Sequence, residues 1–400
     1  MKIRNRWLVV LGTLLAMPCV GAIYTWSLFN NHLMANFGWQ HTEVVLTYSI
    51  AIFMFAFSTM FAGKLQDKIG PRIVTIIGGI LYGSGLMLAS TATSLTQLYI
   101  YIGIIVGAGV GTVYICCLST GVKWFPERKG FISGVVLGAF GLGSFIFSPL
   151  VQYFIELVGA SSAFFYLGIV YLALILIGAM FLVVPDTAAA PTTNTANTPV
   201  VEVKEYTTGE MLKTRAFYMV WLTFFFACTM GHLIIGIATD IGILLAGLPV
   251  AVAGGIVSVF SLLNTAGRLT WGPLADKIGR FKVLTILFSI TAVTMILMGT
   301  TPITHITFFV YLGMVGFCFG GFLASYPGIT GEFYGLKHYG TNYGIMYQAF
   351  GIGALVGAFI KANTAYLETT FLVLAGLAIG GIVLSLITKN PNASVSPKAS

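Results

Sequence analysis

Long apolar runs, each bounded by charged or turn residues, follow one another along the whole of the 400-residue chain. A helix needs about 20 apolar residues to cross the hydrocarbon core of a bilayer. Hydrophobic residues make up 57% of the chain and charged residues 8%, which excludes a water-soluble fold of this length. We therefore predict an all-α membrane protein with twelve transmembrane helices. The predicted spans are 7–28, 43–63, 73–92, 97–120, 130–155 and 162–184, followed by 216–238, 250–272, 283–300, 306–331, 343–363 and 367–388.

The basic residues predict the topology, because Lys and Arg accumulate in cytoplasmic loops. With both termini cytoplasmic, every Lys and Arg except Arg268 and Lys361 falls on the cytoplasmic side of this layout. The net charge of +8 is then explained by a lipid bilayer as partner, and we expect no nucleic-acid partner. Lys361 lies near the outer end of its span, where its long side chain can reach the headgroups.

No pattern of catalytic or metal-binding residues stands out in the sequence. The five cysteines all fall inside predicted spans, with no C-x-x-C pair and no histidine at metal-ligand spacing. Paired carboxylates or a nucleophile with its base are not visible either. We expect no disulfide, no metal, no cofactor and no catalytic residue, so the chain is predicted not to be an enzyme.

An internal repeat divides the chain into two halves. The motif Gly63-Lys-Leu-Gln-Asp67-Lys-Ile-Gly70-Pro-Arg72 recurs 209 positions later as Gly272-Pro-Leu-Ala-Asp276-Lys-Ile-Gly279-Arg280. Ala139-Phe-Gly-Leu-Gly143 likewise recurs, 210 positions later, as Ala349-Phe-Gly-Ile-Gly353. We predict two six-helix bundles, 1–184 and 216–400, joined by a Thr-, Ala-, Asn- and Pro-rich cytoplasmic linker over 185–215. Parallel repeats of this kind bind their ligand near the bilayer midplane and rock one half against the other.

The repeated loop motif predicts a gate. Its aspartate can accept hydrogen bonds at a neighbouring helix terminus, and its basic residues hold the loop at the cytoplasmic face. The gating residues are expected to be Asp67 and Arg72 in the first half and Asp276 and Arg280 in the second. A tight turn with solvated charges is the alternative, but it leaves the duplication unexplained.

Arg268 is the candidate for substrate binding. It lies eight residues before Asp276, which at 1.5 Å per residue puts it roughly 12 Å along the helix into the membrane. An arginine at the centre of a span costs about 2.5–3.5 kcal/mol, so it is a functional candidate. Its forked, permanently charged guanidinium suits a carboxylate. Asn264 is four residues earlier, on the same helix face. The alternative is that Arg268 binds backbone carbonyls or hydroxyl groups.

The loop motif G-x-L-x-D-x-x-G-x-R, present twice, resembles the signature of the major facilitator superfamily. Four further segments resemble the oxalate/formate antiporter family of that superfamily, near the bacterial monocarboxylate transporters, with the YhjX-type, pyruvate-associated members most similar. These segments are Tyr24-Thr-Trp26-Ser-Leu28, Trp124-Phe-Pro126-Glu-Arg128-Lys-Gly130, Asn264-x-x-Gly267-Arg268 and Asn342-Tyr-Gly344. The resemblance covers essentially the whole chain and implies the major facilitator fold.

The resemblance also implies a function. We expect a transporter of small monocarboxylates such as pyruvate, lactate or formate, working by alternating access as a proton symporter or an anion exchanger. The resemblance implies a multi-pass protein of the bacterial inner membrane that works as a monomer. Its expected partner is a small organic anion, with or without a co-transported proton. An oxalate/formate-type exchanger, an exporter of larger amphipathic compounds and a non-transporting carboxylate receptor remain as alternatives.

The same resemblance assigns site residues. The family's arginine in helix eight, which binds the substrate carboxylate, corresponds to Arg268, whereas the second cation of the oxalate exchangers is replaced here by Phe350. A single cation favours a monocarboxylate over a dianion. The aromatic residues that correspond to the family's site are Tyr24, Tyr114 and Tyr347, with Phe140 and Phe350 beside them in the Ala-Phe-Gly repeats. From its own chemistry, His232 is a possible proton carrier, because it is the histidine deep in a span; a merely hydrogen-bonded histidine is the alternative.

Overall fold

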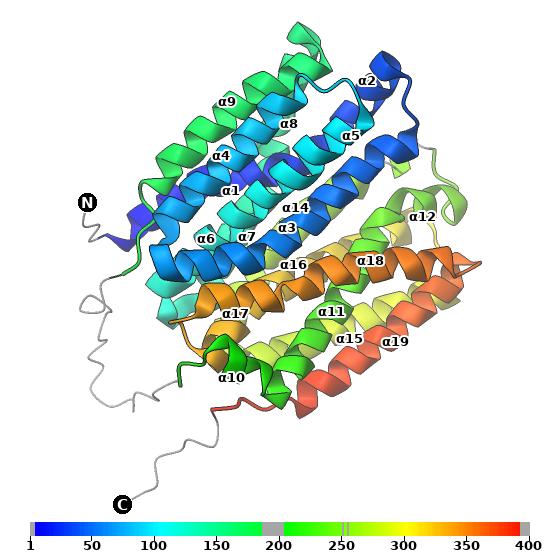
Figure 1. Cartoon of the computed structure of the whole chain (residues 1–400). Helices are drawn as coiled ribbons and strands as arrows, with labels where there is room; N and C mark the ends of the chain where they lie inside the picture. The colour runs from blue at the N-terminus through cyan, green and yellow to red at the C-terminus, as the bar shows by residue number, and fades with distance from the viewer. Residues whose placement is uncertain (1–4, 186–203, 250–251, 254–255, 393–400) are drawn as a thin grey trace, which may run out of the picture. The chain divides into compact units, whose positions relative to one another are not determined.

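The computed structural model describes residues 5–185, 204–249, 252–253 and 256–392, and all regular structure in these ranges is helical (Figure 1). Most of the predicted linker, 186–203, lies outside the described residues. The helices up to the linker are α1 (Arg6–Gly21), η1 (Ala22–Trp26), α2 (Ser27–Phe37), α3 (His41–Ile69), α4 (Pro71–Ala89), α5 (Leu95–Leu98), η2 (Tyr99–Val106), α6 (Gly107–Trp124), η3 (Pro126–Arg128), α7 (Lys129–Gly141), α8 (Gly143–Val158) and α9 (Ala160–Ala179).

The helices after the linker repeat this series of long and short segments. They are α10 (Thr208–Leu212), α11 (Arg215–Gly236), α12 (Ala238–Leu244), α14 (Ile256–Ile278), α15 (Arg280–Thr300), α16 (His305–Tyr334), α17 (Tyr339–Met346), α18 (Gln348–Ala362) and α19 (Leu367–Ile387). Helices lie within every predicted span, and several of them extend further than the apolar run that predicts them.

Eleven helical stretches in the described part of the chain are long and apolar enough to cross a membrane. They confirm an all-helical, multi-span chain. The predicted span 250–272 corresponds to α14, which is not among the eleven and which contains the polar residues Asn264 and Arg268. Its first residues, 250–251 and 254–255, lie outside the described residues. Twelve spans with cytoplasmic termini therefore stay a prediction.

The helix ends follow from local sequence. Asn5 and Thr214 accept hydrogen bonds from the first turns of α1 and α11, which satisfies backbone N–H groups that have no partner inside the helix. Gly70 and Gly279 end the two helices that carry the repeated loop motif, with φ of 88° and 99°. Because this left-handed region disfavours residues with a Cβ, glycine at both positions lets the chain turn at once into the next helix.

The described chain forms two compact units that do not coincide with the two halves of the sequence. Of the described residues, unit 1 comprises 5–126, 139–185 and 336–348, and unit 2 comprises 127–138, 204–249, 252–253, 256–335 and 349–392. Unit 1 therefore contains α17 from the second sequence half, and unit 2 contains most of α7 from the first. In unit 1, α6 packs against α3 and α4, and in unit 2, α14 packs along α16 (Figure 1).

Candidate functional site

Arg268 is buried in the middle of α14, with 5% of its surface exposed. Its Nη1 donates a hydrogen bond to the carbonyl of Leu137, in the part of α7 that belongs to unit 2. Its Nε has no hydrogen-bond partner, and no carboxylate pairs with it among the described residues. One backbone carbonyl therefore binds Arg268, as the alternative interpretation of this residue predicts. The guanidinium nevertheless keeps an unmatched positive charge and an unused donor.

Asn264 lies one turn before Arg268 on α14 and is also buried. Its Nδ2 donates to the carbonyl of Gly316 on α16 at 3.2 Å. This bond fixes the side chain against α16, so the two polar residues predicted for substrate binding are held by backbone carbonyls of two different helices.

His232 and Phe350, both in unit 2, are brought together. Their ring centroids are 4.5 Å apart with the planes nearly perpendicular, and Phe319 of α16 lies on the imidazole at 5.5 Å. The Nε2 atom of His232 is buried without a hydrogen-bond partner. The aromatic ring of Phe350 is therefore in direct contact with the candidate proton carrier.

The other four predicted aromatic residues form one cluster in unit 1. Tyr114 contacts Tyr347 at 5.0 Å and Phe140 at 5.5 Å between ring centroids, and Tyr24 contacts Phe140 at 5.5 Å. Phe55 of α3 lies at the centre of the cluster, 5.0–5.7 Å from three of these rings. Phe55 was not predicted, because it stands in an apolar run where no motif distinguishes it.

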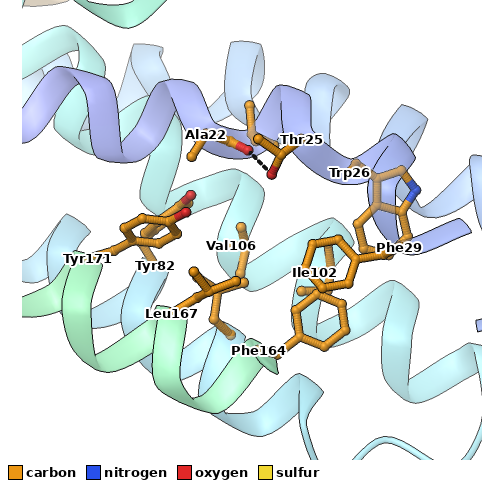
Figure 2. Close-up of a pocket in the computed structure, with 12 residues that line it drawn as sticks. Ala22, Thr25, Trp26, Phe29, Tyr82, Ile102, Val106, Phe164, Leu167 and Tyr171 are labelled. Carbon is orange, nitrogen blue, oxygen red and sulfur yellow. Dashed lines mark hydrogen bonds between the residues drawn. The ribbon is translucent and has the colours of Figure 1, made fainter. Parts of the chain in front are cut away.

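A separate small cavity lies beside the Tyr24-Thr-Trp26 motif, also within unit 1 (Figure 2). It has a volume of about 30 Å³, room for roughly one or two water molecules. Trp26 stacks on Phe29 and Phe164 at one end, and Tyr82 donates to the carbonyl of Cys19 at the other. The cavity is too small for an organic acid, and the four clustered aromatic residues do not line it.

Asp67 caps the N-terminus of α17. Its Oδ2 accepts hydrogen bonds from Thr341 N at 2.9 Å and Thr341 Oγ1 at 3.0 Å, and its Oδ1 pairs with Lys123 Nζ at 2.8 Å. The positive end of a helix dipole favours a carboxylate at this place. Gln348, the first residue of α18, donates a second bond to α3, from its Nε2 to the carbonyl of Ala56 at 2.8 Å.

Asp276 makes the corresponding cap on α7. It accepts hydrogen bonds from Gly130 N at 2.9 Å and Phe131 N at 2.8 Å, and pairs with Arg280 Nη2 at 2.6 Å. Arg280 in turn pairs with Glu332 at 3.0 Å. Thr341 and Phe131, the residues capped in the two units, are 210 positions apart, which is the offset of the second sequence repeat.

The four predicted gating residues differ in their partners. Asp67, Asp276 and Arg280 belong to these two caps, whereas Arg72 donates from Nη2 to the carbonyl of Met180 at the end of α9, at 2.6 Å. The sequence analysis missed Lys123 and Glu332. They are 209 positions apart, the offset between Asp67 and Asp276, so the repeat itself could have indicated them.

A multi-span helical chain with duplicated caps and a buried cation has the features of a secondary transporter. The profile of the Major Facilitator Superfamily matches residues 7–248 and 233–400. The chain belongs to this superfamily, and it is accordingly a multi-pass membrane transporter rather than an enzyme.

Three similar proteins bear on this assignment. An uncharacterized MFS-type transporter, YhjX of Escherichia coli K12, is 38% identical over 352 residues, covering 88% of this chain and 86% of that protein. The oxalate:formate antiporter of Oxalobacter formigenes is 31% identical over 390 residues, covering 95% and 92%. These relatives confirm the resemblance to the oxalate/formate antiporter family. The crystal structure of the superfamily transporter FucP in its outward conformation matches with a TM-score of 0.73 at 14% identity, over 96% of this chain and 98% of that one, and shows the fold alone.

The caps lead to a prediction about gating. Each cap joins a helix of one sequence half to a residue of the other, so we expect the caps to open when the halves move apart. Asp67→Asn and Asp276→Asn each remove a charge-assisted bond of about 1.5–3 kcal/mol. We expect flux into proteoliposomes to fall by roughly tenfold or more, while ligand-dependent thermal stabilisation is retained.

Asp240→Asn is the matched control, because it removes the same charge from an exposed position in the first turn of α12. It should leave both flux and binding unchanged. Parallel loss of binding and flux in the two cap variants would show that the aspartates support folding and not gating.

Proposed function

We propose that this transporter carries small monocarboxylates, such as pyruvate, lactate or formate, by alternating access. The observation that carries the proposal is Arg268: a buried, permanently charged guanidinium inside a span, with no carboxylate partner among the described residues. Keeping such a charge in the membrane is costly unless an anion compensates it. One cation is neutralised by one carboxylate, so a monoanion is the economical substrate.

Two further features support a small monocarboxylate. Phe350 replaces the second cation that the family's oxalate exchangers have, and its ring packs on the ring of His232, so no permanent cation stands at that position. We assign Asn264 to orienting the substrate beside Arg268, and Tyr24, Tyr114, Phe140, Tyr347 and Phe350 to selecting it by size. The name of the Oxalobacter relative includes both a dicarboxylate and a monocarboxylate, so that relative alone does not decide between them.

His232 is proposed to carry the proton if transport is a symport. Its Nε2 is buried without a partner, so a proton taken up there would need an anion nearby. Anion exchange without a proton is the second mechanism, and a pH gradient across the proteoliposome membrane distinguishes the two.

We further propose the topology expected from the charge distribution: twelve spans, bundles 1–184 and 216–400, both termini cytoplasmic, and a monomer in the bacterial inner membrane. Lys213→Cys and Lys337→Cys should then react with a membrane-impermeant maleimide only after the cells are opened. Asp240→Cys and Glu368→Cys should react in intact cells. The five native cysteines are buried and provide a low background. The reverse labelling pattern would contradict the topology.

The substrate assignment predicts the behaviour of two arginine variants. Arg268→Ala and Arg268→Lys should both insert normally but lose at least tenfold in uptake of labelled pyruvate, because lysine is a point charge that lacks the guanidinium fork. Lysine can still donate to the carbonyl of Leu137. If Arg268→Lys transports normally, the role of Arg268 is to hold α7 and not to bind a carboxylate. Arg215→Lys, at the exposed start of α11, is the control.

The missing second cation predicts a change of specificity. Phe350→Lys places an uncompensated charge next to His232, which only a second carboxylate on the ligand can neutralise. The ratio of oxalate to pyruvate in competition for uptake should rise by tenfold or more. Phe350→Met opens a similar space without charge and should leave the ratio near that of the parent. An equal change in both variants would mean that shape and not charge sets the preference.

A further inference from the structure

An apolar groove runs along unit 1 between α3 and α4, with α6 beneath it. Its volume is about 280 Å³. Ten residues line it: Met54, Phe57, Ser58, Phe61, Ala62 and Leu65 from α3, Val74, Ile77 and Leu81 from α4, and Thr112 from α6. None of these residues belongs to the caps or to the candidate substrate site, so the groove is a feature of its own.

The groove arises because α6 approaches both neighbouring helices very closely. A Cβ on Gly111 would collide with the backbone of α3 at Phe55, and one on Gly78 of α4 would come within 2.9 Å of Thr112 of α6. Glycine at these two places lets α6 sit deep between α3 and α4. The two outer helices make few contacts with each other as a result, and the space between them stays open above Thr112.

The lining has small, buried residues at the bottom and large, exposed residues at the sides. Ser58, Ala62 and Val74 are buried, whereas Phe61 is 55% exposed and Phe57 and Ile77 are each 40% exposed. In a chain that spans the membrane, exposed aromatic and aliphatic side chains face hydrocarbon. A slot with small residues at the bottom and large apolar residues at the sides accepts a narrow apolar chain.

Two lysines continue the groove at the end of α3 that carries the repeated loop motif. Phe57, Phe61, Lys64 and Lys68 follow at intervals of three and four residues, so they lie along one face of the helix. Both lysines are exposed, and neither pairs with an acidic residue in the part of the chain that the structure describes. The apolar slot therefore ends at two uncompensated positive charges.

We propose that this groove binds one anionic phospholipid, with an acyl chain between α3 and α4 and the phosphate at Lys64 and Lys68. The occupant follows from the two parts of the surface together, because a hydrocarbon slot requires a chain and the lysine pair requires an anion. With a volume of about 280 Å³, the groove is roughly nine times as large as the small cavity beside Trp26, which leaves room for a stretch of acyl chain.

The bound lipid would lie next to a cap. Asp67, which caps α17, is on the same turn of α3 as Lys64 and Lys68. A phosphate held by these lysines would draw them to the outer face of α3, whereas Asp67 is held by Lys123 and Thr341. Anionic lipid would thus neutralise the lysines without competing for the groups that hold Asp67.

The test compares lipids on the purified full-length protein. Delipidated protein is titrated with phosphatidylglycerol, with phosphatidylcholine and with inorganic phosphate; bound lipid is counted by native mass spectrometry and stability is followed by thermal unfolding. One phosphatidylglycerol should be retained about tenfold more tightly than phosphatidylcholine, since each lysine near an anionic lipid contributes about 1 kcal/mol. Inorganic phosphate alone should not stabilise the protein, and equal stabilisation by phosphate would overturn the proposal.

Variants separate the headgroup from the chain. Lys64→Gln combined with Lys68→Gln should abolish the preference for phosphatidylglycerol but keep binding of either lipid. Ala62→Leu, which fills the groove, and Phe61→Ala combined with Leu65→Ala, which removes its exposed wall, should weaken both lipids alike. The wall variant changes only exposed side chains, so it tests the groove even where Ala62→Leu disturbs folding.

The repeat supplies the matched control. Lys277 stands 209 positions after Lys68, next to Asp276, and Lys277→Gln combined with Lys282→Gln removes the same charge from exposed positions in the second half. This control should retain the full preference for phosphatidylglycerol. If it loses the preference as much as the Lys64 and Lys68 variant does, the effect is one of net charge and the proposed site is wrong. Retention of phosphatidylglycerol by both groove variants would also refute it.

Discussion

The absence of water from the hydrocarbon core determines how the polar groups of this chain must be bonded. Backbone groups in that region must bond within their own helices, and each polar side chain there needs a partner or a function. The pattern of partners reflects this requirement. Asn264 is bonded to a carbonyl of α16, and Arg268 is bonded to a carbonyl of α7 through one of its three nitrogens. The positive charge of Arg268 is what these backbone bonds leave uncompensated, and the carboxylate of the proposed substrate would balance it.

The two aspartate caps provide hydrogen-bond partners for backbone groups at the helix ends. A helix N-terminus presents unpaired N–H groups, and Asp67 and Asp276 satisfy them on α17 and α7. In both cases the capped helix comes from the other half of the sequence, and it lies in the same compact unit as the aspartate that caps it. The bonds that complete these helices therefore also join the two sequence halves, and in the proposed gating mechanism they are the bonds that must break.

The sequence predicted the parts of this arrangement that depend on local pattern. Apolar runs located the helices, and the repeated motif indicated that Asp67 and Asp276 would meet helix termini. It could not indicate which termini, because the contacts of Thr341 with Asp67 and of Gly130 with Asp276 span large separations and involve backbone N–H groups, which any residue but proline provides. The sequence could not single out Phe55 either, because only its packing distinguishes it from the neighbouring apolar residues. The carbonyl of Leu137 that Arg268 uses has no sequence signature either.

The two caps are built on one repeated motif, yet they differ in the charge that completes them. Lys123 neutralises Asp67 in unit 1, while at the equivalent position in unit 2 Glu332 neutralises Arg280. If the two residues were exchanged, the composition of the chain would be unchanged, but a glutamate would face Asp67 and a lysine would face Arg280. Like charges would then meet in both units. The charges of each cap are therefore matched within its own half of the sequence, and exchanging Lys123 with Glu332 would break both matches at once.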